Sequence, residues 1–268
     1  MRSTAQTTIL LFAACMFAIG SLIQIAEQPD NLQLNVIYKP IHSPVDIVSI
    51  PGPEVMPIAY TRVTSLAGLQ VDTKKIKFIE MMLPAILISK NRLQQERQKL
   101  ITLASQSRLT SKEQAWLEQQ QQRFKAKTID ELVFRMNDMP TSIILAQAAI
   151  ETGWGTSRFF LEGNNVFGVW SGNPKEPRIR ASESRDGKAI YVKKYASLLE
   201  AIDDYFLTIG RGGPYQKLRQ ARLASSDPLK LINYLGSYSE LGSVYIERLR
   251  SMITHNKLQR YDQSRLAI

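Results

Sequence analysis

Cysteine and histidine are scarce in this sequence of 268 residues, which has one cysteine and two histidines. A single cysteine, Cys15, permits no intramolecular disulfide, so packing must hold the fold together. His42 and His255 lie far apart in the sequence with no second ligand near either. This disfavours a histidine-based zinc site and also a Ser-His-Asp or Cys-His catalytic arrangement. We therefore expect a protein that needs no metal and no organic cofactor.

Acidic residues are also few, with 24 Asp and Glu against 34 Lys and Arg and a formal net charge of +10. Residues 1–60 hold two basic and four acidic side chains, which leaves 32 basic against 20 acidic in the remainder. No helix-turn-helix, zinc-finger or aromatic RNP-type pattern accompanies this charge, so we expect no nucleic acid partner. Attraction to an anionic polymer or to lipid headgroups explains the charge equally well.

The N-terminus carries an apolar run of 18 residues, Ile9 to Ala26, preceded by Arg2 and followed by acidic residues. This length and charge order predict a transmembrane helix with its positive end inside. A cleaved signal peptide is the alternative, but residues 24–26 make a poor cleavage site and the run is longer than a usual signal core. Lipidation at Cys15 is disfavoured because apolar residues continue beyond it. We therefore expect residues 1–26 to be an N-terminal membrane anchor.

The next segment is rich in proline and shows no sustained helical period. Its prolines are Pro29, Pro40, Pro44, Pro51, Pro53 and Pro57. Such a composition predicts an extended tether over residues 27–65, leaving 66–268 as the folded domain. Apolar pieces such as Val45 to Ile50 could instead pack on the domain as an arm.

Helical signals dominate the rest of the chain. Residues 74–106 have helical periodicity with Pro84 as a kink or break, and 110–113, 128–131 and 197–200 are capping boxes. Between Trp170 and Tyr195 the pattern alternates around Asp-Gly at 186–187, which predicts a β-hairpin. The fold class is therefore mainly α (α+β) with a small hairpin lobe.

Thr141 begins ten residues that are nearly all apolar, which predicts a buried helix. We expect Thr141 to be its N-cap, while Gly153 and Gly155 end it and place Glu151 in the last turn. The negative end of the helix dipole and apolar surroundings both raise the pKa of a carboxyl. Glu151 is thus a candidate general acid, although a Glu at a helix end can also be a solvated terminus.

Two glycine-rich turns, an indole and two amides follow this acid closely, at Trp154, Asn164 and Asn165. Amides can bind hydroxyl and acetamido groups, and an indole can stack on a sugar face, so these residues predict a carbohydrate cleft. The candidate substrate-binding residues are Gln147, Trp154, Asn164, Asn165, Phe167 and Trp170.

The blocks AQAAIETGWGTSRF and NNVFGVW resemble the signature of bacterial peptidoglycan glucosaminidases with a lysozyme-like helical fold, and more closely the Bax-like, membrane-attached branch. The resemblance covers residues from about 72 to 260. It implies a catalytic domain that binds peptidoglycan glycan strands, held in the periplasm by a single-pass anchor in the inner membrane. The sequence leaves the oligomeric state open.

The resemblance also implies a second acidic residue on the β-lobe, and Glu183 matches that position, with Glu176 and Asp186 as substitutes. If side chains alternate along the strand, Glu183 lies on the same face as Ile179 and Ala181. The alternative is that Glu183 lies on the exposed outer face of the hairpin, among its basic residues.

Family members further place a tyrosine near the scissile bond. We favour Tyr238 for this role over Tyr245, which fits a core position better; a structural role is the alternative for each.

We therefore predict an endo-β-N-acetylglucosaminidase that cleaves the bond from N-acetylglucosamine to N-acetylmuramic acid. In this prediction Glu151 is the general acid, and Glu183 is the base or a stabilising carboxylate unless the substrate's acetamido group assists. The alternatives are a lytic transglycosylase that uses a single Glu and a peptidoglycan-binding scaffold without turnover.

Overall fold

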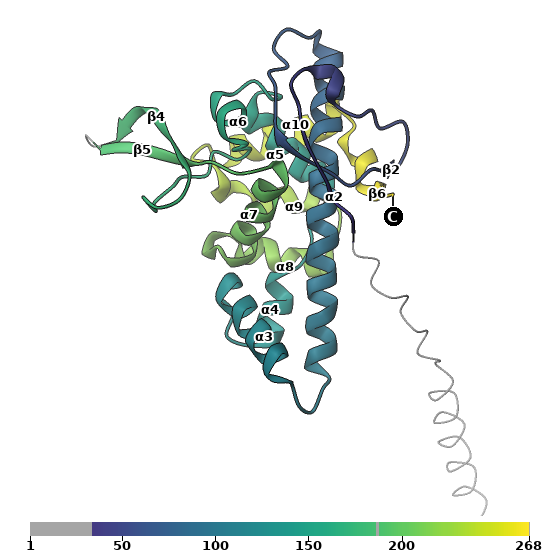
Figure 1. Ribbon diagram of the computed structural model, residues 1–268, viewed down its shortest axis with the longest axis vertical. Helices are drawn as coiled ribbons and strands as arrows, with labels where there is room; N and C mark the ends of the chain where they lie inside the picture. The colour runs from purple at the N-terminus through teal and green to yellow at the C-terminus, as the bar shows by residue number, and fades with distance from the viewer. Residues whose placement is uncertain (1–33, 186–187, 268) are drawn as a thin grey trace, which may run out of the picture. The chain divides into compact units, whose positions relative to one another are not determined.

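Helices make up most of the described structure, a computed structural model that covers residues 34–185 and 188–267 apart from the side chains of Glu183 and Arg185 (Figure 1). The α-helices are α2 (Val71–Ala104), α3 (Ser111–Phe124), α4 (Ile129–Arg135), α5 (Thr141–Thr152), α6 (Arg158–Gly163), α7 (Leu198–Arg211), α8 (Gln216–Ala224), α9 (Pro228–Leu231) and α10 (Ser243–His255). Short 3-10 turns lie at η1 (Pro44–Asp46), η2 (Gly213–Tyr215), η3 (Ile232–Tyr234), η4 (Gly236–Tyr238) and η5 (Leu258–Gln263).

The strands form two-stranded sheets. They are β1 (Ile37–Pro40), β2 (Glu54–Val55), β3 (Ile58–Arg62), β4 (Arg178–Arg185), β5 (Lys188–Lys193) and β6 (Arg265–Leu266). β1 pairs with β3 and β2 with β6, both in parallel, whereas β4 and β5 form the antiparallel hairpin that the sequence predicts. The mainly α prediction with a hairpin lobe is thus confirmed.

Helix α2 continues through Pro84, where the sequence predicted a kink or break. Proline removes one backbone hydrogen bond and costs roughly 3 kcal/mol in a helix interior. The residues on both sides of Pro84, including Met82 and Ile86, are fully buried against the surrounding elements. Tertiary packing of this kind supplies most helix stability in proteins, and here it outweighs the local cost.

The described part of the predicted tether packs on the domain, as the arm alternative would have it. Residues 36–267 form one compact unit, so the expected boundary at residue 65 does not separate two bodies. Ile41, Val55 and Tyr60 are buried, and β2 pairs with β6 near the C-terminus. Burying these apolar side chains stabilises the packed arm, whereas an extended tether would leave them exposed to water.

The predicted membrane location is corrected by the structure. No helix within residues 34–185 and 188–267 is long and apolar enough to cross a membrane. The apolar run within residues 1–26, on which that prediction rested, lies outside the described residues.

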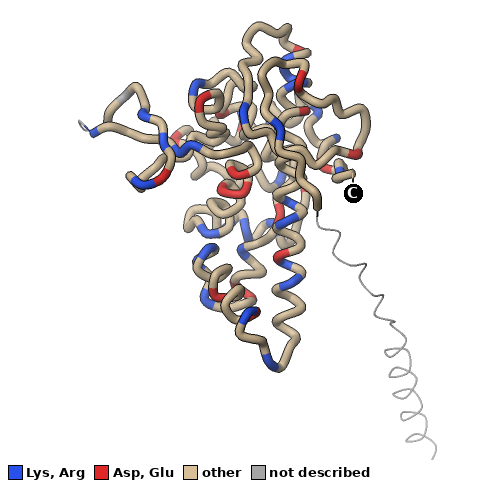
Figure 2. Tube along the Cα trace, in the orientation of Figure 1, with Lys and Arg blue, Asp and Glu red and all other residues tan. Residues whose placement is uncertain are grey.

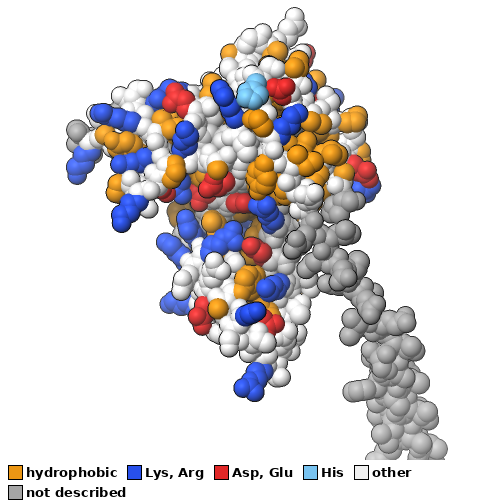
Figure 3. Space-filling model, in the orientation of Figure 1, with side chains coloured by type: hydrophobic (Ala, Val, Ile, Leu, Met, Phe, Trp, Pro, Cys, Tyr) orange, Lys and Arg blue, Asp and Glu red, His pale blue; other side chains and the backbone are white. Residues whose placement is uncertain are grey.

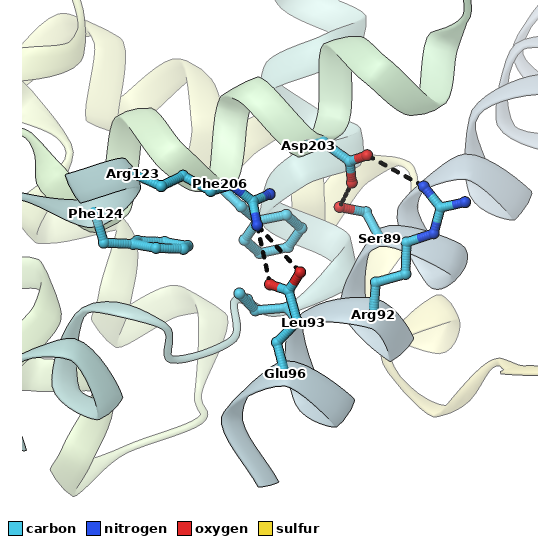
Figure 4. Close-up of a pocket in the computed structure, with 8 residues that line it drawn as sticks. All are labelled: Ser89, Arg92, Leu93, Glu96, Arg123, Phe124, Asp203 and Phe206. Atoms are coloured by element: carbon cyan, nitrogen blue, oxygen red, sulfur yellow. Dashed lines mark hydrogen bonds and ion pairs between the residues drawn. The ribbon is translucent and has the colours of Figure 1, made fainter. Parts of the chain in front are cut away.

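Two ion pairs connect α2 to α3 and α7 around a cavity of about 300 Å³ (Figure 4). Arg123 donates to both carboxylate oxygens of Glu96 at 3.1 Å, while Ser89 and Arg92 donate to Asp203. Burial raises the pKa of Glu96 and of Asp203, against the opposing effect of the arginines. The cavity is polar and is lined by none of the predicted site residues, so we regard it as a packing feature.

Helix α5 begins differently from the prediction, since Pro140 is the N-cap and Thr141 is already helical. Asp262, in η5, caps the helix from a distance of 120 residues along the chain: it accepts from the Ser142 backbone N–H at 2.7 Å and from the Ser142 hydroxyl at 2.8 Å. Lys90 donates to the Thr141 hydroxyl at 3.1 Å. A carboxylate at this end of a helix also complements the helix dipole.

Replacing Asp262 by alanine should lower the free energy of unfolding by about 1–2 kcal/mol, because it removes this cap and leaves a buried helix end unsatisfied. Urea unfolding followed by circular dichroism measures the effect. Glu240→Ala, at an exposed position, is the control and should change stability little. Equal stability of both variants would show that the cap contributes nothing.

Candidate active site

Glu151 lies in the last turn of α5, as predicted, and its side chain is half-buried. Burial raises the pKa of this carboxyl, and the hydrogen bond from Tyr245 opposes the rise. The C-terminal end of the helix carries partial negative charge and therefore also raises the pKa of the Glu151 carboxyl. A carboxyl in such surroundings stays protonated closer to neutral pH, which is the state that a general acid requires.

The turn after Glu151 is fixed by its own hydrogen bonds. Gly153, Trp154 and Gly155 all have positive φ, at 57°, 59° and 81°. The Trp154 backbone N–H donates to the Ala149 carbonyl at 3.0 Å, which closes the helix end. A side chain at Gly155 would lie 3.1 Å from Phe78, so both the conformation and the space require glycine there.

A buried chain of hydrogen bonds ends on Glu151. The Tyr205 hydroxyl donates to Gln147 Oε1 at 2.8 Å, Gln147 Nε2 donates to the Tyr245 hydroxyl at 3.2 Å, and that hydroxyl donates to Glu151 Oε1 at 3.0 Å. Gln147 is fully buried. In each of these three hydrogen bonds the donor is the residue further from Glu151 along this chain of hydrogen bonds. Glu151 Oε1 therefore accepts from Tyr245, and the other carboxyl oxygen is the one that can carry the acid's proton. Gln147 therefore positions the acid from within the core, whereas the sequence predicted a contact with substrate.

Tyr245, and not Tyr238, makes the hydrogen bond to Glu151. Tyr245 is 1% exposed, so its predicted core position is correct, yet its hydroxyl reaches the acid from α10. Tyr238 is half-buried and stacks on the Tyr245 ring with centroids 5.7 Å apart and planes 9° apart. Burial raises the pKa of both tyrosines, so both stay neutral. No local pattern could have revealed a contact between residues 94 positions apart.

The amides of Asn164 and Asn165 bind the protein's own backbone. Asn164 Nδ2 donates to the carbonyls of Thr61 and Tyr195, at 2.9 and 3.0 Å. Asn165 Nδ2 donates to the carbonyls of Val169 and Lys193, and Asn165 Oδ1 accepts from the Val169 N–H. Both side chains are buried, so these hydrogen bonds join the end of α6 to β3 and to the base of the hairpin, whereas the sequence predicted contacts with substrate.

The aromatic residues that we predicted for the cleft divide into two kinds. Phe167 is 7% exposed and packs on Tyr205 with centroids 4.7 Å apart, which makes it a core residue. Trp154 is half-buried with one edge on Phe78, and Trp170 is 58% exposed beside the hairpin, where its backbone pairs with Val192. The two indoles thus keep surface that a sugar ring could contact.

The hairpin does not keep the simple alternation on which the choice of Glu183 rested. Arg180 pairs with Tyr191 and Ser184 with Ala189, so four steps along β4 match two along β5. Glu183 lies within this irregularity. Because the extra residues break the alternation of side chains, the face on which Glu183 lies cannot be derived from its position in the strand. Its side chain lies outside the described part of the structure, as do Asp186 and the turn.

The hairpin is basic: Figure 2 marks Lys and Arg positions along its strands in blue, and Figure 3 shows basic side chains over this part of the molecule. They include Arg178, Arg180, Lys188 and Lys193. Glu176, one of the alternative acids, accepts a hydrogen bond from the Ser171 hydroxyl at 2.7 Å. Within residues 34–185 and 188–267, no three His, Cys, Asp or Glu side chains are grouped as a metal site would require.

Comparison with known proteins matches the part of the chain that holds this site to a family model. Residues 130–258 match the glucosaminidase family model, described as mannosyl-glycoprotein endo-beta-N-acetylglucosaminidase. The chain is 27% identical to Protein bax of Escherichia coli K12 over 198 residues, which are 69% of this chain and 70% of that protein. It is 34% identical to the peptidoglycan hydrolase FlgJ of Salmonella typhimurium LT2 over 139 residues, 47% of this chain and 42% of FlgJ.

A solved glycoside hydrolase domain of Salmonella typhimurium FlgJ, truncated at its C-terminus, aligns with a TM-score of 0.35 at 27% identity, over 52% of this chain and 97% of that domain. The chain spans less than half the length of intact FlgJ. Residues 130–258, which include α5 and Glu151, thus form a region that matches the glucosaminidase family model, and this match together with the FlgJ relatives supports a glycoside hydrolase.

Proposed function

We propose that this protein hydrolyses peptidoglycan glycan strands as an endo-β-N-acetylglucosaminidase, at the bond from N-acetylglucosamine to N-acetylmuramic acid. The observation that carries the proposal is Glu151, a carboxyl with a raised pKa that Tyr245 holds within the family-matched region. Two relatives with the printed name peptidoglycan hydrolase support the choice of polymer. A buried helix ending in an acid, with a hairpin downstream, supports a lysozyme-like arrangement.

In the proposed reaction Glu151 gives its proton to the glycosidic oxygen as the bond to the sugar C1 breaks. The C1 centre acquires oxocarbenium character, and a water molecule adds to it and loses a proton. Glu183 is the proposed base for that water or the carboxylate that stabilises the positive charge. The substrate's acetamido group is the alternative source of this stabilisation.

A lytic transglycosylase is the second candidate, because it needs one catalytic Glu and Glu151 is the acid whose surroundings the structure describes. Its product has an anhydro end, whereas hydrolysis leaves a reducing N-acetylglucosamine end. A scaffold would release neither. Mass spectrometry of muropeptides from digested sacculi separates these outcomes, and anhydro ends would contradict the proposed hydrolysis.

Tyr245→Phe should shift the alkaline limb of the pH–rate profile to higher pH. The Tyr245 hydroxyl stabilises the ionised form of Glu151 and so lowers its pKa; removing the hydroxyl favours the protonated acid. Activity is lost as the pH rises through the pKa of Glu151. In Tyr245→Phe that pKa is higher, so activity should persist to a higher pH than in the parent.

The control is Tyr238→Phe, which leaves the Tyr245–Glu151 hydrogen bond intact and should leave the limb in place. Profiles of kcat measured on a soluble peptidoglycan fragment test both variants. A shift of the limb in Tyr238→Phe but not in Tyr245→Phe would show that Tyr238, the tyrosine favoured from the sequence, acts on Glu151.

A further inference from the structure

Two hollows, of about 310 and 390 Å³, share Trp154 in their linings. Both are lined by Lys75 of α2 and by His255 and Asn256 at the end of α10. The first also includes Asp72 and Arg260, and the second includes Ile150 and Arg248. We call the two together the Trp154 groove; α2, α5, η5 and α10 form its walls.

The Trp154 groove has excess positive charge. Lys75, Arg248 and Arg260 line it against one carboxylate, that of Asp72. Within the described part of the chain, no carboxylate oxygen lies within 4.0 Å of these three cations, whereas Arg123 and Arg135 are paired with glutamates. Cations gathered in a hollow without acidic partners attract anionic ligands more strongly than the same charges spread over a flat surface.

Trp154 is held in this groove at a conformational cost. Its φ of 59° lies in the left-handed region, which bulky residues rarely adopt because it is strained for them. The indole packs edge-on against Phe78 with centroids 5.5 Å apart, and Lys75 Nζ lies 5.5 Å from the indole centroid. A fixed indole beside a cation presents a stacking face for a sugar ring and a partner for a carboxylate.

The Trp154 groove adjoins the residues around the acid. Ile150, in its lining, precedes Glu151, and Arg248 follows Tyr245 by one turn of α10. A polymer bound at Glu151 could therefore continue along the groove, whereas a short oligomer would not need it.

We propose that the Trp154 groove is a second carbohydrate site, which binds a carboxylate-bearing glycan strand outside the residues that cleave it. The inference rests on the proposed function for the identity of the strand, since peptidoglycan supplies both sugar rings and carboxylates. The groove retains the enzyme on the polymer and takes no part in the bond cleavage.

The test measures binding without turnover. In the full chain carrying Glu151→Gln, the pair Lys75→Glu and Arg248→Glu reverses two groove cations. The matched pair Lys217→Glu and Lys230→Glu reverses two exposed lysines on α8 and α9 and changes the net charge equally. Co-sedimentation with purified sacculi should show affinity reduced about tenfold or more for the groove pair and less than about twofold for the control pair.

Sacculi whose carboxylates have been amidated should bind the parent protein and the groove pair about equally. The same loss in both charge-reversal pairs, or none in the groove pair, would overturn the inference, as would a loss that persists on amidated sacculi. In the chain that keeps Glu151, both pairs should cleave a short soluble peptidoglycan fragment with amidated carboxylates at the parental rate. If the chain that keeps Glu151 binds sacculi through the groove but releases no fragments, the proposed function fails and the binding site stands.

Discussion

Glu151→Gln should lower kcat by about two to four orders of magnitude, the usual contribution of a general acid. The substitution keeps the size of the side chain and an oxygen that can accept from Tyr245, but it removes the proton that the leaving oxygen needs. Substrate binding should change little, so kcat and kcat/KM should fall together. Release of soluble fragments from sacculi measures the rate, and the unfolding midpoint shows whether the variant is folded.

Glu162→Gln is the matched control for this substitution, because Glu162 is an exposed carboxyl on α6 whose partner is Arg158. It should retain parental activity. Full activity in Glu151→Gln would exclude the mechanism proposed for this site, whatever the products.

We expect the second largest effect from Glu183→Gln, with a loss of about ten- to a hundredfold in kcat. The loss should be smaller than for Glu151 because a neighbouring acetamido group or water can partly replace the carboxylate in stabilising the transition state. Initial rates on sacculi at several pH values measure it. If Glu183 is the base, the acidic limb of the pH–rate profile should also be lost, since activity there depends on its ionised form.

Glu176→Gln controls for the choice of acid on the hairpin lobe. Glu176 accepts from Ser171, and its loss should affect the local turn more than the rate. Parental activity in Glu183→Gln, together with anhydro ends among the products, would favour the single-acid transglycosylase instead. A larger loss in Glu176→Gln than in Glu183→Gln would move the second acid to position 176.

The sequence by itself determined those features that depend on neighbouring residues. The apolar run from Thr141 and the glycines at 153 and 155 were enough to predict a buried helix with Glu151 in its last turn. Thr110 and Glu113 form the predicted capping box, and the Asp-Gly pair at 186–187 predicted the pairing of β4 with β5. These features follow from periodicity, turn conformation and caps, which are local properties of the backbone.

Only the tertiary structure decided which groups these side chains contact. Glu151 receives its hydrogen bond from Tyr245, and Asp262 caps α5 although the two lie 120 residues apart. Asn164 and Asn165 bind backbone carbonyls inside the domain. An amide that binds backbone and one that faces a ligand look the same in a sequence, because the partner is set by long-range packing, which places each side chain next to groups that no local pattern specifies.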